Sequence, residues 1–374
     1  MSVYFGAHNI ISPLGLNSLS NFDSLLKGLS GVEKQNFNFS DADFYCSKIN
    51  ENNIDSAFSK LGNPSDYTFA EKLSILSIQD VLNQSQLDLK DKDKLLILST
   101  TKGNIDILEN KYPLLSKDRA YLPEFGNVIG TFFESAHTPL IVSNACISGL
   151  LAIIIAKRFL ENKTYKNIIV CGVDIISEFT LSGFKSFNAL SSAECKPFDA
   201  NRTGINLGEA AASILLSRDP ISNLTITSGS SANDANHISG PSREGSGLFQ
   251  SIEATFKDAG KTKVDFISAH GTATEYNDEM EAIAFSRANL QDTPLNSLKA
   301  YYGHTLGAAG VLESIISLQS LSSNTLIASK GFESSGKSKA LNIITENISK
   351  PLSSCLKTAS GFGGCNASAI FEKI

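Results

Sequence analysis

Short runs of aliphatic and β-branched residues alternate with longer apolar segments at helical spacing, and this alternation is the strongest constraint on the fold. The predicted strands are residues 94–100, 139–145, 167–176, 209–216, 225–231 and 264–272. The predicted helices are residues 146–162, 247–260, 278–290 and 308–323. A final hairpin-like pair is expected from residues 341–345 and 356–373. Apolar strands that alternate with helices predict an α/β protein whose parallel or mixed sheet is covered on both faces.

The length of the chain predicts more than one structural unit. At about 150 residues per domain, 374 residues suffice for two to three units. The best junction is residues 216–224, which contain SRDPISN and are too short for a flexible tether. We therefore expect two halves, residues 1–220 and 221–374, that share an interface.

Charge and composition disfavour several classes of protein. The net charge is -6 and no Lys/Arg block occurs, which disfavours a nucleic-acid binder. The longest aliphatic run, residues 150–156, is far shorter than the ~20 residues that cross a bilayer, so no membrane insertion is expected. The first ten residues lack the pattern of a secretory signal, so the cytoplasm is the expected location.

The cysteines and histidines do not follow a metal-binding pattern. The six cysteines and five histidines show no CxxC or HxxxH spacing, so no metal site is expected. In a long cytosolic chain the thiols should be reduced, and most of them should be buried small apolar residues. A reactive cysteine must therefore be identified from its surroundings.

Cys146 occupies the junction between a predicted strand and an apolar helix, in the sequence SNACISG. The unpaired N–H groups of a first helical turn favour a thiolate, so this position predicts a lowered pKa and a nucleophilic thiol. Ser148 and Gly149 keep the turn small enough for a substrate to approach. The alternative is a buried packing cysteine, because free cysteine is among the most buried residue types.

His270 ends a predicted strand and is followed by Thr272 and Thr274. A side chain at the carboxyl end of a strand in an α/β sheet faces the crevice where ligands usually bind. The two hydroxyls have a period of two and are placed to hydrogen-bond one side of a polar ligand arm. A core histidine and two strand-forming threonines are the alternatives.

His304 lies in the small-residue segment YGHTLGAAG, before a predicted helix. A helix N-terminus disfavours a protonated imidazole, so we expect a neutral ring that donates from one nitrogen. Lys299 is either a solvated charge or the partner of a buried carboxylate. Asp278 and Glu281, three residues apart and hence on one helix face, are the candidate partners, with a solvated face as the alternative.

The sequence GFGGCN, residues 361–366, is rich in glycine around one aromatic residue. Gly361 and Phe362 begin a loop that can expose backbone N–H groups and swing the phenyl ring. A tight turn is the alternative. The spacing and the lysine of a phosphate-binding loop are absent, so nucleotide binding is disfavoured.

Taken in order, these segments resemble the β-ketoacyl-acyl carrier protein synthases, the elongating, decarboxylating branch of the thiolase-fold condensing enzymes. The resemblance runs from Gly6 to the last strand, and its most specific motifs are NACISG, KPFDANRTGINLGEAA, AHGTATEYNDEMEA, LKAYYGHTLGAAG and GFGGCN. It implies a thiolase-like fold in which two similar α/β halves pack as a layered α-β-α-β-α core. The chain departs from the family in being short between Thr101 and Pro139, and in having KPFD where relatives have RPWD.

The resemblance also implies roles for individual residues. The catalytic triad is Cys146, His270 and His304, and the second histidine separates this branch from relatives with Cys-His-Asn or Cys-His-Cys sets. The remaining implied roles are ordering of the active site by Lys299, Glu281 and Asp278, binding of a phosphopantetheine arm by Thr272 and Thr274, gating by Phe362 beside Gly361, and an oxyanion hole from the backbone N–H groups of Phe362 and Cys146.

The implied reaction is a decarboxylative Claisen condensation of an acyl thioester on Cys146 with malonyl-acyl carrier protein, in fatty-acid or in polyene- or polyketide-type synthesis. It requires no metal or redox cofactor, because the phosphopantetheine arm arrives on the carrier protein. Acyl carrier proteins are acidic, so Lys185, Lys196, Arg202 and also Arg243 are expected to form a docking patch. The chain is expected to form a homodimer or a heterodimer with a second ketosynthase-like subunit.

Two other functions compete with this interpretation. A chain-length-factor-like subunit would shape the pocket of a partner synthase and have little activity of its own. Such subunits usually lack the nucleophile, so Cys146 argues against this alternative, whereas the short stretch between Thr101 and Pro139 favours it. A thiolase or an acyltransferase without decarboxylation is the third candidate, and it would release no carbon dioxide from a malonyl thioester.

Overall fold

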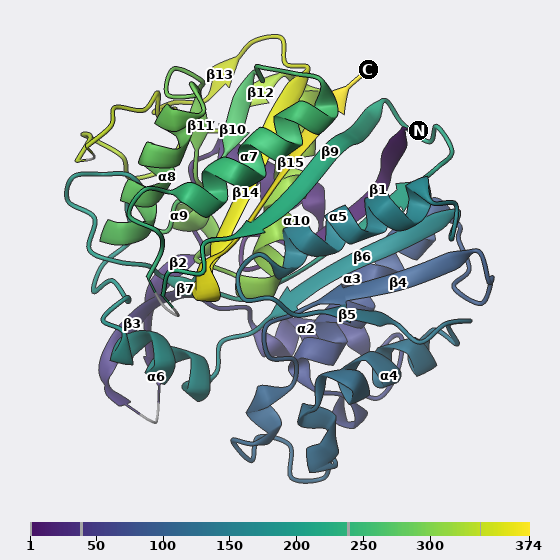
Figure 1. Cartoon of the computed structure of the whole chain (residues 1–374). Helices are drawn as coiled ribbons and strands as arrows, with labels where there is room; N and C mark the ends of the chain where they lie inside the picture. Colours follow the sequence, from purple (N-terminus) through teal and green to yellow (C-terminus); the bar gives the residue numbers. More distant parts are fainter. Residues whose placement is uncertain (1, 38–39, 238–239, 337) are drawn as a thin grey trace.

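The computed structural model describes residues 2–37, 40–237, 240–336 and 338–374 (Figure 1). Ten strands form one mixed sheet in the order β11-β10-β14-β15-β9-β1-β8-β6-β4-β5. Their bounds are β1 Val3–Ile11, β4 Lys94–Ser99, β5 Leu140–Val142, β6 Asn167–Asp174, β8 Ala210–Ser217, β9 Leu224–Asn233, β10 Phe266–Ser268, β11 Leu295–Asn296, β14 Ser354–Gly361 and β15 Cys365–Lys373. The predicted α/β class is therefore confirmed.

The two ends of this sheet repeat one topology. Numbered within each half, the strands of residues 3–217 and those of residues 224–373 both follow the order 3-2-4-5-1. In both halves strand 2 is parallel to strands 3 and 4, and strands 4, 5 and 1 are antiparallel in turn. The halves meet where the first strand of each, β1 and β9, pair antiparallel at Val3 with Ile226 and Tyr4 with Thr225.

Helices lie on the outer faces of the two halves of the large sheet and also between the two halves (Figure 1). Helix α3 covers β1, β6 and β8, whereas α7 covers β9 and β15. Helices α5 and α10 contact strands of both halves and each other, so they form the central layer. The result is the α-β-α-β-α layering of a thiolase-like fold. The helix bounds are α1 Ser18–Leu26, α2 Glu51–Phe58, α3 Phe69–Ser85, α4 Leu122–Phe132, α5 Ser148–Glu161, α6 Glu178–Ser186, α7 Ser246–Ala259, α8 Glu275–Arg287, α9 Lys299–Tyr302 and α10 Ala309–Ser323.

Five short strands lie outside the large sheet. A three-stranded sheet has the order β2-β3-β7, with bounds Val32–Phe37, Ser40–Ser47 and Leu207–Gly208. A two-stranded sheet pairs β12, Thr325–Leu326, with β13, Ile348–Ser349. Among the residues that the structure describes, no helix is long and apolar enough to span a bilayer.

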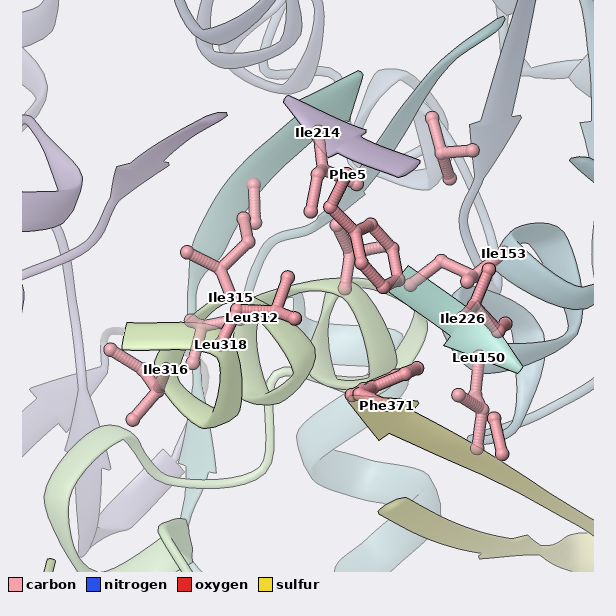
Figure 2. Close-up of a cluster of buried hydrophobic side chains, with 14 of the residues drawn as sticks. Phe5, Leu150, Ile153, Ile214, Ile226, Leu312, Ile315, Ile316, Leu318 and Phe371 are labelled. Carbon is pink, nitrogen blue, oxygen red and sulfur yellow. The ribbon is translucent and has the colours of Figure 1, made fainter. Parts of the chain in front are cut away.

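The main hydrophobic core lies around the central helix layer (Figure 2). Aliphatic side chains of α5 and α10 fill it together with aliphatic and aromatic side chains of the flanking strands. Those labelled in the figure are Phe5, Leu150, Ile153, Ile214, Ile226, Leu312, Ile315, Ile316, Leu318 and Phe371. The two helices approach closely because Gly310 has no side chain: a Cβ there would lie 2.2 Å from the backbone nitrogen of Leu150. This contact sets the distance between the two halves at the level of the site.

Three predicted elements differ in the structure. The strand predicted at residues 264–272 is limited to Phe266–Ser268, so His270 lies beyond its end. The strand predicted at residues 139–145 ends at Val142, because the following residues form the turn that carries Cys146. The predicted pairing of residues 341–345 with 356–373 is wrong, because β14 and β15 form a hairpin within the second segment. The amides of Asn342 and Ile344 instead donate to the carbonyls of Gln291 and Leu295, which leaves one isolated bridge at Ile343.

Candidate active site

Three turns at the ends of buried elements bring together Cys146, His270 and His304. Cys146 lies between β5 and α5, His270 follows β10, and His304 follows α9. One ligand-type atom from each residue lies within 4.8 Å of the others, and the imidazole centroids are 5.1 Å apart. All three side chains are buried, and they line one cavity of about 630 Å³. Thiolate and imidazole are also zinc ligands, so these three residues are the ones here that could hold a metal.

The turn before Cys146 is strained and tightly held. Ala145 has a φ of 44°, in the left-handed region that residues with a Cβ seldom adopt. The hydroxyl of Ser148 accepts from the amide of Asn144 at 2.8 Å and donates to the carbonyl of Ala145 at 2.6 Å. A Cβ at Gly149 would lie 2.8 Å from the carbonyl oxygen of Gly307, so only glycine fits there. The turn therefore fixes the nucleophile against the loop that carries His304.

The pKa of the Cys146 thiol is raised, not lowered. Burial raises it to about 12, and Cys365 and Asp174 add to the rise, whereas Lys299 and the backbone of Phe362 lower it. The predicted lowering by the helix N-terminus is wrong, because loss of hydration outweighs it. The thiol therefore needs a base to remove its proton when it reacts, and the two histidines are the neighbouring bases.

His304 is held in one tautomer. The amide of Leu306 donates to its Nδ1 at 3.3 Å, so the proton belongs on Nε2. Nε2 is buried without a hydrogen-bond partner among the described residues, and the ring lines the cavity. The carboxylate of Asp174 accepts from the amide of Gly307 at 2.7 Å and so holds the loop in place. An unpaired buried N–H beside a cavity is a donor ready for a substrate oxygen.

Both imidazoles are neutral. Burial lowers the pKa of His270 and of His304 well below 6.5, and the positive charge of Lys299 lowers both further. The predicted neutral state is confirmed for His304, although burial is its main cause instead of the helix N-terminus. A neutral imidazole can take a proton from a thiol or donate one hydrogen bond to a carbonyl.

We expect condensation on the preformed acyl-enzyme to continue at full rate below pH 6.5. The lowered pKa values keep both histidines neutral until the pH falls well below the value of free histidine, so the loss of rate on the acid side should begin there. The measurement is the single-turnover rate of the acyl-enzyme with malonyl-carrier protein between pH 5 and 8. A half-maximal rate at pH 6.5 or above would contradict this expectation.

Asp278 and Glu281 hold the loop around His270 and do not bind Lys299. Asp278 accepts from the amide of Thr272 at 2.9 Å, and Glu281 accepts from the amides of His270 and Gly271 at 2.8 and 2.6 Å. Both carboxylates are fully buried, so the alternative of a solvated helix face is wrong. The predicted pairing with Lys299 is also wrong, because backbone amides occupy these oxygens.

Lys299 instead pairs with Glu313 in the middle of α10. The other carboxylate oxygen of Glu313 lies 2.8 Å from the ammonium nitrogen of Lys357, on β14. All three side chains are buried. One carboxylate thus pairs with two lysines, and both lysines act electrostatically on the two histidines.

The mouth of the cavity carries the predicted substrate-binding residues. The hydroxyls of Thr272 and Thr274 lie 2.8 Å apart, and both residues line the cavity with Gly361 and Phe362. The ring of Phe362 is 37% exposed and stacks on Phe184 of α6, with centroids 5.5 Å apart. A mobile ring at this point would open or close the path to Cys146.

The proposed docking residues differ in their surroundings. Arg202 lines the cavity mouth and donates to the carbonyls of Asp199, Thr274 and Glu275. Lys196 pairs with the exposed carboxylate of Glu333 at 2.9 Å, and Lys185 lies 5.7 Å from the ring centroid of Phe44. Arg202 is the one of these three that lines the cavity.

Sequence reasoning missed Glu313, Lys357 and the aromatic partners Phe184 and Phe187 of the gating ring. A signal for the charged residues was available, because Glu313 in α10 and Lys357 in β14 are each the one charged residue of a buried element. The two phenylalanines belong to no motif that the sequence analysis identified, and Phe187 is more than half exposed, so it is not a core residue either.

A buried cysteine opposed by two histidines at the centre of this layered fold defines a thiolase-fold acyltransferase. Sequence models described as Beta-ketoacyl synthase, N-terminal domain, and Beta-ketoacyl synthase, C-terminal domain, match residues 105–220 and 224–333. The chain belongs to the beta-ketoacyl synthase family.

Individual relatives agree with this assignment. A protein of Schizosaccharomyces pombe named as a mitochondrial 3-oxoacyl-acyl-carrier-protein synthase is 27% identical over 97% of this chain and 97% of its own length. The 3-oxoacyl-acyl-carrier-protein synthase 2 of Coxiella burnetii is 28% identical over 62% of this chain and 61% of its own. One chain in the solved structure of a ketosynthase in complex with its chain length factor, from Xenorhabdus doucetiae, matches with a TM-score of 0.86 at 23% identity, over 100% of this chain and 98% of that chain. At that identity the structural match shows the fold alone.

Proposed function

We propose that this chain forms a 3-ketoacyl thioester on an acyl carrier protein, with Cys146 as the nucleophile and His270 and His304 as the groups that stabilise the enolate. The observation that carries the proposal is the placement of one buried thiol and two neutral imidazoles within 4.8 Å at the end of one cavity.

The proposed reaction begins with acylation. A histidine takes the thiol proton, the sulfur attacks an acyl thioester, and the carrier thiol leaves with a proton. The backbone N–H groups of Cys146 and Phe362 would hold the oxyanion, since a Cβ on the adjacent Gly361 would lie only 3.0 Å from the Cys146 nitrogen. The acyl group is then a thioester on Cys146.

Condensation follows when a malonyl thioester enters with its phosphopantetheine arm bound at Thr272 and Thr274. The two imidazoles donate to its thioester carbonyl, carbon dioxide leaves, and the carbanion attacks the acyl-cysteine carbonyl. The carbon–sulfur bond to Cys146 breaks, and the 3-ketoacyl product stays on the carrier. This scheme uses no metal or redox cofactor.

The partners are part of the proposal. An acyl carrier protein would dock at Lys185, Lys196, Arg202 and Arg243, and a homodimer or a heterodimer with a second ketosynthase-like subunit would complete the enzyme. Similar solved structures support both kinds of partner, because one is a ketosynthase in complex with its chain length factor and another is a type II polyketide acyl-carrier protein in complex with its ketosynthase. A relative named as a 3-oxoacyl-acyl-carrier-protein synthase 2 and one named as a polyketide synthase subunit are both 28% identical, so the comparisons favour neither fatty-acid nor polyketide synthesis.

Two further proposals concern organisation and location. The boundary between residues 220 and 221 is supported by the repeated strand order and by the two family matches that end at 220 and begin at 224. A reducing compartment such as the cytoplasm is supported by the six cysteines, which are all free.

Mass spectrometry of the acyl-enzyme tests the function. A mixed pool of acyl-carrier proteins should add one acyl mass at Cys146, and malonyl-carrier protein should then release carbon dioxide and 3-ketoacyl-carrier protein. The acylation rate should fall as salt rises, because docking on an acidic carrier is electrostatic. An unmodified Cys146 would favour a chain-length-factor-like subunit, acylation without carbon dioxide would favour a simple acyltransferase, and a salt-independent rate would exclude the docking patch.

A further inference from the structure

Lys357 is a buried cation that the proposed reaction leaves unexplained. It lies in the middle of β14, its side chain is 0% exposed, and its neighbours along the strand are Leu356 and Thr358. Burial of an ammonium group costs more free energy than burial of an alkyl chain of similar length, because the charge loses its hydration. An apolar side chain at this position would avoid that cost. A lysine at this position therefore points to a use for its charge.

The ammonium group of Lys357 is surrounded by oxygen atoms from three different elements. It donates to the carbonyls of Ser268 at 3.0 Å and Thr358 at 2.6 Å, and it pairs with Glu313 at 2.8 Å. A longer contact of 3.5 Å reaches the carbonyl of Ala269. All three N–H donors are thus used, and the side chain ties the end of β10 to helix α10.

These contacts connect Lys357 to the backbone that precedes His270 and to the partner of Lys299. Ser268 and Ala269 are the two residues before His270, so the lysine holds the end of the strand that presents this ring. Its carboxylate partner, Glu313, binds Lys299 with the other oxygen. Lys357 is therefore linked to His270 through the carbonyls of the preceding residues, and to Lys299 through Glu313. It is not among the residues that line the cavity.

We propose that Lys357 is a positioning residue for condensation: a fixed internal cation that orients His270 through the β10 carbonyls and holds the Glu313–Lys299 pair in place. The inference rests on the proposed roles of His270 and His304 in the second half-reaction. It assigns Lys357 no contact with the substrate.

The charge of Lys357 also acts on the two imidazoles. The charged groups around it are Glu313 of α10, Lys299 of α9 and Glu281 of α8, and Lys102 faces His304 from the other side. Both histidine pKa values are lowered by Lys357 in addition to burial and Lys299. Removal of this charge would raise these pKa values, so the acid limb of the rate profile would move to higher pH.

Two variants separate the charge from the packing. Lys357→Gln keeps a donor in the strand and removes the charge, and Lys357→Ala leaves room for a small cation. We expect both to lower kcat for condensation at least tenfold, to leave KM for malonyl-carrier protein nearly unchanged, and to move the acid limb of the rate profile to higher pH. Ammonium chloride should partly restore the alanine variant, whereas tetramethylammonium chloride should not, because it is too large. Lys257→Gln, at an exposed position on α7, is the matched control.

Several results would overturn the proposal. A Lys357→Gln enzyme with the kcat and pH profile of the wild type would do so, and so would variants that unfold by circular dichroism, because they would show a structural role only. Failure of the proposed function is a separate result, because the wild-type chain itself would then form no 3-ketoacyl product.

Discussion

Replacement of Cys146 by alanine should abolish formation of the 3-ketoacyl product, with a loss of at least ~10⁴-fold in kcat, the scale seen when a nucleophile is removed. The alanine offers no atom that can carry the acyl group, so the first half-reaction has no product. None of the other five cysteines can substitute, because Cys146 is the cysteine whose sulfur lies with both imidazoles in the cluster that the described residues form.

The measurement is steady-state turnover together with the mass of the protein after incubation with acyl-carrier protein. Cys171→Ala removes a thiol that is equally buried in β6 but lies in a different hydrophobic cluster, so it serves as the control and should keep its turnover. Full activity of the Cys146 variant would exclude the proposed mechanism. Inactivity of both the wild type and the variant would instead favour a chain-length-factor-like subunit.

The second large effect should come from Glu313, whose removal leaves two buried ammonium groups without an anion. Glu313→Gln should lower the free energy of unfolding by about 3–5 kcal/mol, the cost of breaking a buried ion pair from one side. The effect should be this large because both lysines are fully buried and neither is screened by water.

Chemical denaturation followed by far-UV circular dichroism measures this loss. Glu253→Gln makes the same chemical change at an exposed position of α7 and should alter the free energy of unfolding by less than about 0.5 kcal/mol. A loss below about 1 kcal/mol in the Glu313 variant would show that the lysines lose their charge or find other partners in the native state.

The strands and helices were predictable from the sequence where the apolar pattern was continuous. The strand at β6 and the helices at α5 and α10 lie within a few residues of their predicted bounds, because burial on both faces leaves a long apolar run. Helix α7 also lies within a few residues of its predicted bounds, because its buried residues recur at helical spacing. The pairing of residues 341–345 failed because a short apolar run does not say whether its backbone bonds go to a strand or to a loop.

The sequence predicted which residues form the site better than it predicted their pKa values and ion pairs. The motifs placed Cys146, His270 and His304 at the ends of elements, which is enough for the topology to bring them together. The thiol pKa depends on how deeply the sulfur is buried. The partner of Lys299 depends on which carboxylates already accept hydrogen bonds from backbone amides, as Asp278 and Glu281 do. The thiol pKa follows from packing between the halves, and the partner of Lys299 follows from its contact with Glu313 within the second half, so the order of residues along the chain contains neither of them.

The central layer of α5 and α10 has a thermodynamic consequence. Each of these helices is buried along most of its residues, and it is covered on one side by strands of its own half and on the other by strands of the other half. Either half alone would expose a helix face that no loop of its own can cover, so neither half should be stable by itself. The chain should therefore unfold in one cooperative transition, although its topology is a duplication.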